Sequence, residues 1–286
     1  MSLSIQKQKS KENNLPAMAV SMALILFGLT MALLQDIVRA PVYIQASLTP
    51  LKKPDRPDFS QYNQLLKTFA KNGRVDYKNL RSSPLLQAAM EEMATTSPDN
   101  FKKLDDIVCY WFNAHNLIAI KIVCDEYPVV APLKLKREFI VRHFVVGGKA
   151  HSAETIWVDC IHPKLIDKRK DRAVQPDSIF LLCRAYLGYP EITDHAVTAE
   201  TMRSDISSNL ERFVRNPANL VYKPEAHIFS ISRFFQFYRD VFGQGFEDPW
   251  AFAMYYYDKA DQVPFEPRLA KTFIQNFNWS INDISH

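Results

Sequence analysis

The longest uncharged stretch of the chain lies near its N-terminus. Residues 17–34 carry no charge, and as a helix this run would rise roughly 27 Å, enough to cross the hydrocarbon core of a bilayer. Gln35 and Asp36 end it. A cleaved signal peptide is the main alternative, but its apolar core is usually only ~7–15 residues long. The pattern therefore predicts an uncleaved transmembrane anchor over residues 17–35.

The charges around this run predict its orientation. Lys7, Lys9 and Lys11 precede it, and few basic residues follow it closely. Because basic flanks stay on the cytoplasmic side, residues 1–16 are expected to form a cytoplasmic tail. The main part of the protein is then expected on the periplasmic or extracellular side, so a single-pass membrane location is predicted.

Prolines dominate the segment that follows the predicted anchor. Residues 36–57 contain Pro41, Pro50, Pro54 and Pro57. Proline has no N–H to donate and clashes with a preceding helical turn, so we expect a stiff, extended Pro-rich tether here.

From residue 58 to residue 286 no linker interrupts the pattern, which predicts one extracytoplasmic domain. Apolar residues recur at helical spacing in six segments, which are residues 59–70, 83–94, 104–125, 198–214, 232–242 and 248–259. The third segment is apolar on nearly every side, so we expect it to be the central helix of the core.

Three places favour strands instead. Residues 139–146 are β-branched and aromatic and precede Gly147-Gly148, residues 178–183 form a short continuous apolar run, and residues 220–229 suggest a hairpin around Pro224. The predicted fold is therefore α+β, a helix-rich single domain around a small sheet, preceded by one N-terminal transmembrane helix.

Charge and composition narrow the function classes. The chain has 35 basic and 31 acidic residues, interspersed, with a formal net charge of +4. Nucleic-acid binding needs a more focused basic surface, so no nucleic-acid partner is expected. No cysteine or histidine spacing resembles a zinc site, and we predict neither a metal nor a cofactor.

The four cysteines leave several alternatives open. Cys109 and Cys124 lie on one predicted helix, roughly 22 Å apart, too far to bridge. Cys109 could pair with Cys160 and Cys124 with Cys183, or Cys109 with Cys183 and Cys124 with Cys160. All four could equally be free.

Five short motifs stand in order along residues 58–283. They are Asn72-Gly73-Arg74-Val75-Asp76-Tyr77, Trp111-Phe112-Asn113-Ala114-His115-Asn116, Tyr127-Pro128, the run from Phe180 to Pro190 that contains Cys183, and Trp279-Ser280-Ile281-Asn282. Each is weak alone. Their order and spacing together resemble the bacterial and plant family known as domain of unknown function family 547, many of whose members look exported or membrane-tethered. The family has no agreed activity.

Two departures from the family pattern bear on function. Family members usually carry Ile-Glu-His followed by Leu-Arg, whereas the aligned stretch here places Trp157 and Val158 at the Glu and His positions. A second family cysteine corresponds to Tyr189. If the resemblance implied a Cys–His site, this chain would lack its base.

Cys183 is the candidate nucleophile, because a thiolate needs a nearby base to form. His162, four residues after Val158 and expected on nearly the same helical face, could replace the missing histidine, as could His143 or His151. Asn113 and Asn116 share a helix face and could bind a ligand or partner; alternatively, their amides could satisfy buried backbone groups.

These observations lead to one functional hypothesis and one alternative. The hypothesis is a membrane-tethered extracytoplasmic binding, accessory or scaffold protein that has lost the Glu-His pair and has a protein partner in an envelope or membrane complex. The alternative is a cysteine-dependent hydrolase or transferase that uses Cys183 with a relocated histidine such as His162.

Overall fold

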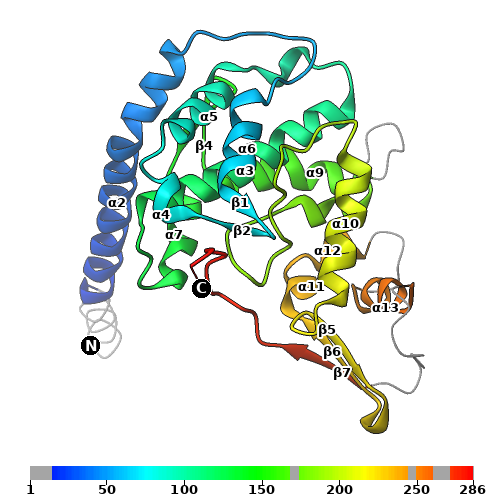
Figure 1. The fold of residues 1–286 in the computed structure, drawn as a ribbon. Coiled ribbons are helices and arrows are strands. Elements are labelled where there is room, and N and C mark those ends of the chain that lie inside the picture. Colours follow the sequence, from blue (N-terminus) through cyan, green and yellow to red (C-terminus); the bar gives the residue numbers. More distant parts are fainter. Residues whose placement is uncertain (1–14, 168–173, 244–248, 260–270, 286) are drawn as a thin grey trace, which may run out of the picture.

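The computed structural model describes residues 15–167, 174–243, 249–259 and 271–285 (Figure 1). Most of the expected cytoplasmic tail lies outside these residues. The α-helices are α2 (Leu15–Leu48), α3 (Ser60–Phe69), α4 (Tyr77–Leu80), α5 (Pro84–Thr95), α6 (Leu104–Asp125), α7 (Leu135–Val141), α8 (Ala153–Thr155), α9 (His162–Leu165), α10 (Met202–Arg215), α11 (Arg233–Phe237), α12 (Arg239–Phe242) and α13 (Pro249–Lys259).

Shorter helical turns and strands complete the description. The 3-10 turns are η1 (Pro98–Asn100), η2 (Pro132–Lys134), η4 (Pro176–Leu181) and η5 (Pro224–Ala226), and η3 (Ile156–Ile161) is a π-helical turn. The strands are β1 (Ala70–Lys71), β2 (Arg74–Val75), β3 (Phe144–Val146), β4 (Lys149–His151), β5 (Leu220–Lys223), β6 (Ile228–Ser232) and β7 (Lys271–Gln275).

Helix α6 is the centre of the hydrophobic core, as its pattern predicts. One connected cluster of buried side chains runs from Phe59 to Ile281, and α6 contributes to it along its whole length. Among the described residues, α6 is also the helix whose length and composition would suit a membrane, but 83% of its apolar window is buried inside the protein. It is therefore a core helix.

The helix-rich α+β class is confirmed, but no single sheet organises the fold. The described residues form three separate sheets: β1 with β2, β3 with β4, and β5-β6-β7. The third holds the expected hairpin, with Tyr222 opposite Phe229, and adds β7 in parallel to β6. This sheet extends away from the main body in Figure 1. The core is thus built on helices, with the sheets at its edges.

Most predicted helices form close to their expected bounds. Ser83 accepts a hydrogen bond from the Leu85 N–H and starts α5, with Pro84 in the first turn, which satisfies a backbone group that would otherwise lack a partner. The expected helix over residues 232–242 divides instead into α11 and α12 at Tyr238.

Two predicted strands are wrong. Residues 139–146 begin as helix α7, because Leu135 and Phe139, four residues apart, are both buried on one side of a helix while Ile140 is 54% exposed. Only β3 remains of that strand. The second, residues 178–183, is mostly the 3-10 turn η4, in which the Phe180 and Leu181 carbonyls are bonded by asparagine side chains rather than by a neighbouring strand.

The prediction of an extended Pro-rich tether over residues 36–57 is also wrong. Helix α2 continues through Pro41 to Leu48, because one missing N–H interrupts a helix locally without ending it when the flanking turns are intact. Beyond it, Lys52 donates to the Thr95 carbonyl and accepts from the Ser97 N–H, at 2.8 and 2.9 Å. The segment is therefore docked on the domain and does not hold the domain at a distance.

All four cysteines are free. Cys109, Cys124 and Cys183 are buried and Cys160 is half-buried. Neither disulfide pairing that the sequence allows is formed.

Candidate functional site

Cys183 lies in the core, bounded by two asparagines. Its N–H donates to Asn116 Oδ1 at 2.9 Å, and Asn282 Nδ2 lies 3.7 Å from its Sγ. The thiol is 4% exposed. Burial raises its pKa to about 12 and outweighs the hydrogen bond from the Ala185 N–H, which favours the thiolate; the charge of Glu191 raises the pKa further.

Four of the five motifs meet around this residue. The Val75 N–H donates to the Asn282 carbonyl, and the Asn282 N–H donates to the Ala185 carbonyl. Tyr77 Oη donates to Asn282 Oδ1 at 2.6 Å, and Asn282 Nδ2 donates to the Gly73 carbonyl. Segments up to 209 residues apart in sequence are thus joined by buried polar bonds. Such a hub fixes the core, because an unpaired group in it would be costly.

The three candidate histidines are engaged in other parts of the structure. His162 contacts Asp240 through Nε2, His143 Nδ1 lies 2.9 Å from the Val141 carbonyl, and His151 packs against the Trp111 ring. Within the described ranges, no imidazole is hydrogen-bonded to the Cys183 thiol. The predicted Cys183–His162 pair is therefore not assembled.

The geometry of η3 sets the position of His162. The His162 N–H bonds to the Trp157 carbonyl, five residues back, so the turn is wider than an α-helical one. His162 consequently lies against the Trp157 ring, with centroids 5.2 Å apart, while Val158 is 50% exposed. The wider turn brings His162 over Trp157, five residues back, which α-helical spacing would place on a different face.

Asn113 and Asn116 both bond backbone groups. Asn113 donates to the Val197 carbonyl at 2.7 Å and accepts from the Val197 N–H at 3.1 Å. Asn116 likewise donates to the Leu181 carbonyl and accepts from Cys183. Both amides are buried and occupied, so the structural alternative describes them and neither is available to a ligand.

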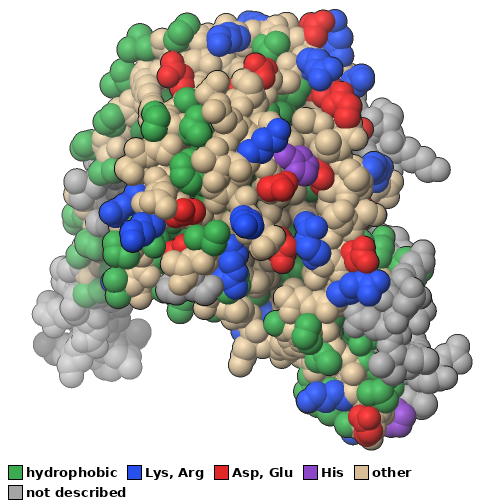
Figure 2. Space-filling model, in the orientation of Figure 1, with side chains coloured by type: hydrophobic (Ala, Val, Ile, Leu, Met, Phe, Trp, Pro, Cys, Tyr) green, Lys and Arg blue, Asp and Glu red, His purple; other side chains and the backbone are tan. Residues whose placement is uncertain are grey.

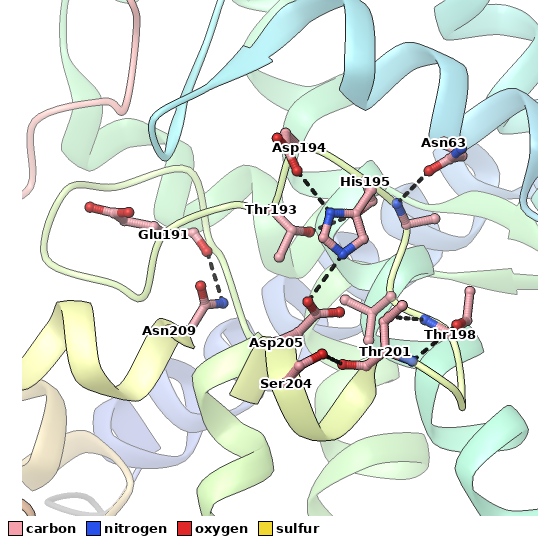
Figure 3. Close-up of polar contacts among 12 residues, drawn as sticks. Asn63, Glu191, Thr193, Asp194, His195, Thr198, Thr201, Ser204, Asp205 and Asn209 are labelled. Atoms are coloured by element: carbon pink, nitrogen blue, oxygen red, sulfur yellow. Dashed lines mark hydrogen bonds and ion pairs between the residues drawn. The ribbon is translucent and has the colours of Figure 1, made fainter. Parts of the chain in front are cut away.

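A histidine that sequence reasoning missed is held between two carboxylates (Figure 3). His195 Nδ1 lies 2.8 Å from Asp194 Oδ1 and its Nε2 lies 3.0 Å from Asp205 Oδ1. Asp194 precedes it in the loop, whereas Asp205 comes from α10. With Asn63 accepting from the Ala196 N–H, these bonds fasten residues 193–198 to α10 and α3.

The charge state of His195 follows from these neighbours. Burial alone would lower its pKa, but the hydrogen bonds and charges of Asp194 and Asp205 outweigh burial and raise the pKa. Both ring nitrogens then donate, so the ring cannot accept a proton while the cluster is intact. His195 and Asp194 line an open cavity of about 820 Å³ with Asp58, Lys67 and Thr198. We therefore interpret His195 as a charged group that holds the loop to α10, and not as a general base.

His115 was also overlooked, although it lies inside the second motif. It is fully buried, and burial lowers its pKa well below the usual range, an effect that the charge of Arg184 strengthens. Its Nδ1 lies 3.4 Å from Asn116 Oδ1, and it is neutral. Its position on the apolar helix α6 was the available sequence signal. Over the described residues, no three His, Cys, Asp or Glu side chains gather as a metal would require.

Comparison with known proteins adds no relative. No family model matches the chain, and neither a curated protein nor a solved structure matches it.

Proposed function

We propose that this protein is a membrane-tethered, extracytoplasmic binding protein, an accessory or scaffold component that resembles domain of unknown function family 547 and does not use cysteine chemistry. Its N-terminal helix anchors it, and its folded domain presents binding surfaces to a partner in an envelope or membrane complex. The observation that carries this proposal is that Cys183 is buried and its pKa is raised.

The Cys183 thiol lacks what nucleophilic catalysis needs. It is buried, its pKa is about 12, and its polar neighbours are an amide, a backbone N–H and a carboxylate whose charge opposes ionisation. A nucleophilic cysteine normally has a lowered pKa and an adjacent base. The cysteine-dependent alternative therefore has no supporting geometry among the residues described.

Helix α2 supports the membrane part of the proposal. Leu24, Ile25, Leu26 and Phe27 are 66, 61, 58 and 65% exposed. Four consecutive helical residues point in directions about 100° apart and so cover the whole circumference of the helix. Hydrophobic side chains follow this edge of the molecule in Figure 2, whereas charges of both signs are interspersed elsewhere on that face. An all-round apolar surface suits lipid better than a one-sided protein groove.

The convergence of the motifs supports the family part. Motifs that resemble the family are bonded to one another around Cys183, as expected if they mark one conserved structural centre of a shared fold. We propose that in this chain these motifs stabilise the fold and do not take part in catalysis.

Thiol labelling of the folded full-length protein tests the proposal. With iodoacetamide near pH 7.5, we expect Cys183 to react only as fast as the protein unfolds, and more slowly than the half-buried Cys160. In urea the four cysteines should react alike, which provides the control. Rapid, stoichiometric labelling of Cys183 in the folded protein would contradict the proposal, and His115 would then be the first base to substitute.

A further inference from the structure

A second cavity is lined in part by Arg184, the residue that follows Cys183 in the chain. It has a volume of about 330 Å³ and is formed where α7, α8, η3, α11 and the C-terminal segment come together. Seven of its lining residues are aromatic: Phe139, Trp157, Tyr186, Tyr189, Phe237, Tyr238 and Trp279. This volume is at the lower end of the range typical of small-molecule sites.

The aromatic rings form a continuous wall. Trp157 meets Tyr238 edge to face at 4.9 Å, and Tyr186 meets Trp279 at 5.3 Å between centroids. Tyr186, Tyr189 and Tyr238 are each less than a tenth exposed, so their faces are held by packing. A planar or apolar ligand body would find a rigid, preformed surface here.

The polar groups of the cavity are mostly donors. Arg184 donates through Nη2 to Glu154 Oε2 at 3.0 Å, while its buried Nε has no partner among the described residues. Tyr189 accepts from Tyr238 at 3.1 Å, which leaves its own proton free to donate. Lys136 reaches over the Trp279 ring, with Nζ 3.4 Å from the centroid.

The charge of these groups does not cancel. Glu154 neutralises Arg184, and Lys136 adds one further positive charge at the rim. Burial lowers the pKa of Lys136, as expected for an ammonium group partly removed from water without an anion beside it. Two donors, Lys136 and Tyr189 Oη, one excess positive charge, and acceptors already occupied by Arg184 and Tyr238 call for a ligand that brings its own acceptors and a negative charge.

We propose that this cavity binds a small organic carboxylate with a flat apolar or aromatic body, whose carboxylate meets Lys136 and Tyr189 Oη beside the Arg184–Glu154 pair while its body packs against the aromatic wall. This deepens the proposed function, on which it rests, by naming the ligand class of the binding protein. Nothing in it uses the Cys183 thiol.

Titration of the full-length protein, kept in detergent micelles, with 3-phenylpropionate tests the assignment. Binding is followed by calorimetry and by the fluorescence of the protein, since Trp157 and Trp279 both line the cavity. We expect saturable binding of the acid, with the matched amide 3-phenylpropionamide and the amine 3-phenylpropylamine at least about tenfold weaker, because each loses the charge-assisted bonds.

Two variants localise the binding without disturbing the buried ion pair. Lys136→Gln, at an exposed position, should weaken binding of the acid about tenfold, and Tyr189→Phe, which keeps the ring, should weaken it several-fold. Arg137→Gln is the matched control, because Arg137 is exposed on the same helix and does not line the cavity; it should bind as the unchanged protein does.

Equal binding of acid, amide and amine would overturn the assignment, as would no binding of the acid at 10 mM, roughly the weakest affinity such a small ligand should show. An unchanged affinity in Lys136→Gln would also overturn it. These results would leave the thiol-labelling result for Cys183 untouched, so failure of this inference is distinguishable from failure of the proposed function.

Discussion

At the scale of single residues, polar side chains decide the structure around Cys183. Motifs and helical spacing in the sequence mark Cys183, Asn113 and Asn116, and in the structure all three are buried and hydrogen-bonded to other parts of the fold. The sequence does not reveal that Asn282 would join Tyr77 to Gly73, since partners more than 200 residues apart are brought together only by the fold. Function was therefore expected at residues that the structure uses for bonding.

This difference predicts unequal costs for two alanine substitutions. Cys183→Ala removes one small buried side chain and should lower the free energy of unfolding by about 1 kcal/mol. Asn282→Ala leaves the fully buried Tyr77 hydroxyl without its acceptor and should cost roughly 2–3 kcal/mol. Urea denaturation of both variants measures this. A larger loss for Cys183→Ala would contradict the assignment of Asn282 as the structural hub.

His195 should make stability depend on pH. Its pKa is raised in the folded protein, so the stabilisation is fully present below the unfolded value near 6.5 and is lost as pH rises through the folded value. His195→Gln, measured against the unchanged protein, should cost about 1–2 kcal/mol at pH 6, a figure reduced for partial exposure, and less at pH 9.

His227→Asn is the matched control for that measurement. His227 is exposed at the tip of the β5–β6 hairpin with φ of 49°, a conformation that asparagine tolerates. It should show no such pH-dependent difference. A cost at His195 that is equal at pH 6 and pH 9 would show that the imidazolium charge does not stabilise the loop.

At the scale of elements, the sequence predicts long helices well and short irregular segments poorly. Residues 104–125 and 84–95 form the helices that their hydrophobic patterns predict, because many apolar side chains in each range recur at helical spacing. The run 178–183 is apolar, and a short apolar run does not distinguish a strand from a buried turn. Two of its carbonyls, those of Phe180 and Leu181, accept from asparagine side chains on other elements, which no local pattern encodes.

Asn113 bonds the Val197 backbone in the same way, so it offers a test of this role of buried asparagine side chains. Asn113→Ala removes both partners of the buried Val197 backbone, so the free energy of unfolding should fall by roughly 2–4 kcal/mol. Asn63→Ala, which removes one bond to the neighbouring Ala196 N–H at a half-buried site, should cost about 1 kcal/mol. Equal losses of unfolding free energy in the two variants, measured by chemical denaturation, would contradict the view that the buried Asn113 amide is what fixes this backbone segment.

At the scale of the whole molecule, the structure changes where the folded domain begins. The Pro-rich composition predicts an extended tether, yet Lys52 pairs with the Thr95–Ser97 backbone and the Leu51 side chain covers Gly148 so closely that a Cβ there would lie 2.7 Å away. Proline content indicates where regular structure is disfavoured, but docking depends on tertiary contacts that composition does not contain.

Two truncated chains should therefore differ in stability. A chain that begins at Pro41 keeps the end of α2 and the docked segment, whereas one that begins at Asp58 loses two backbone hydrogen bonds and the cover over Gly148. The shorter chain should unfold with a free energy lower by about 2 kcal/mol. Identical denaturation midpoints would show that residues 41–57 do not contribute to the fold.

The location of the intact protein tests the central proposal most directly. After alkaline and high-salt washing of membranes, the full-length protein should stay in the membrane fraction, because an apolar helix in lipid is not released by titrating charges. Protease added outside intact cells or spheroplasts should digest the folded domain and spare a tag at the N-terminus. Release of the protein by salt or alkali, or digestion of the N-terminal tag together with protection of the domain, would contradict a membrane-tethered extracytoplasmic protein.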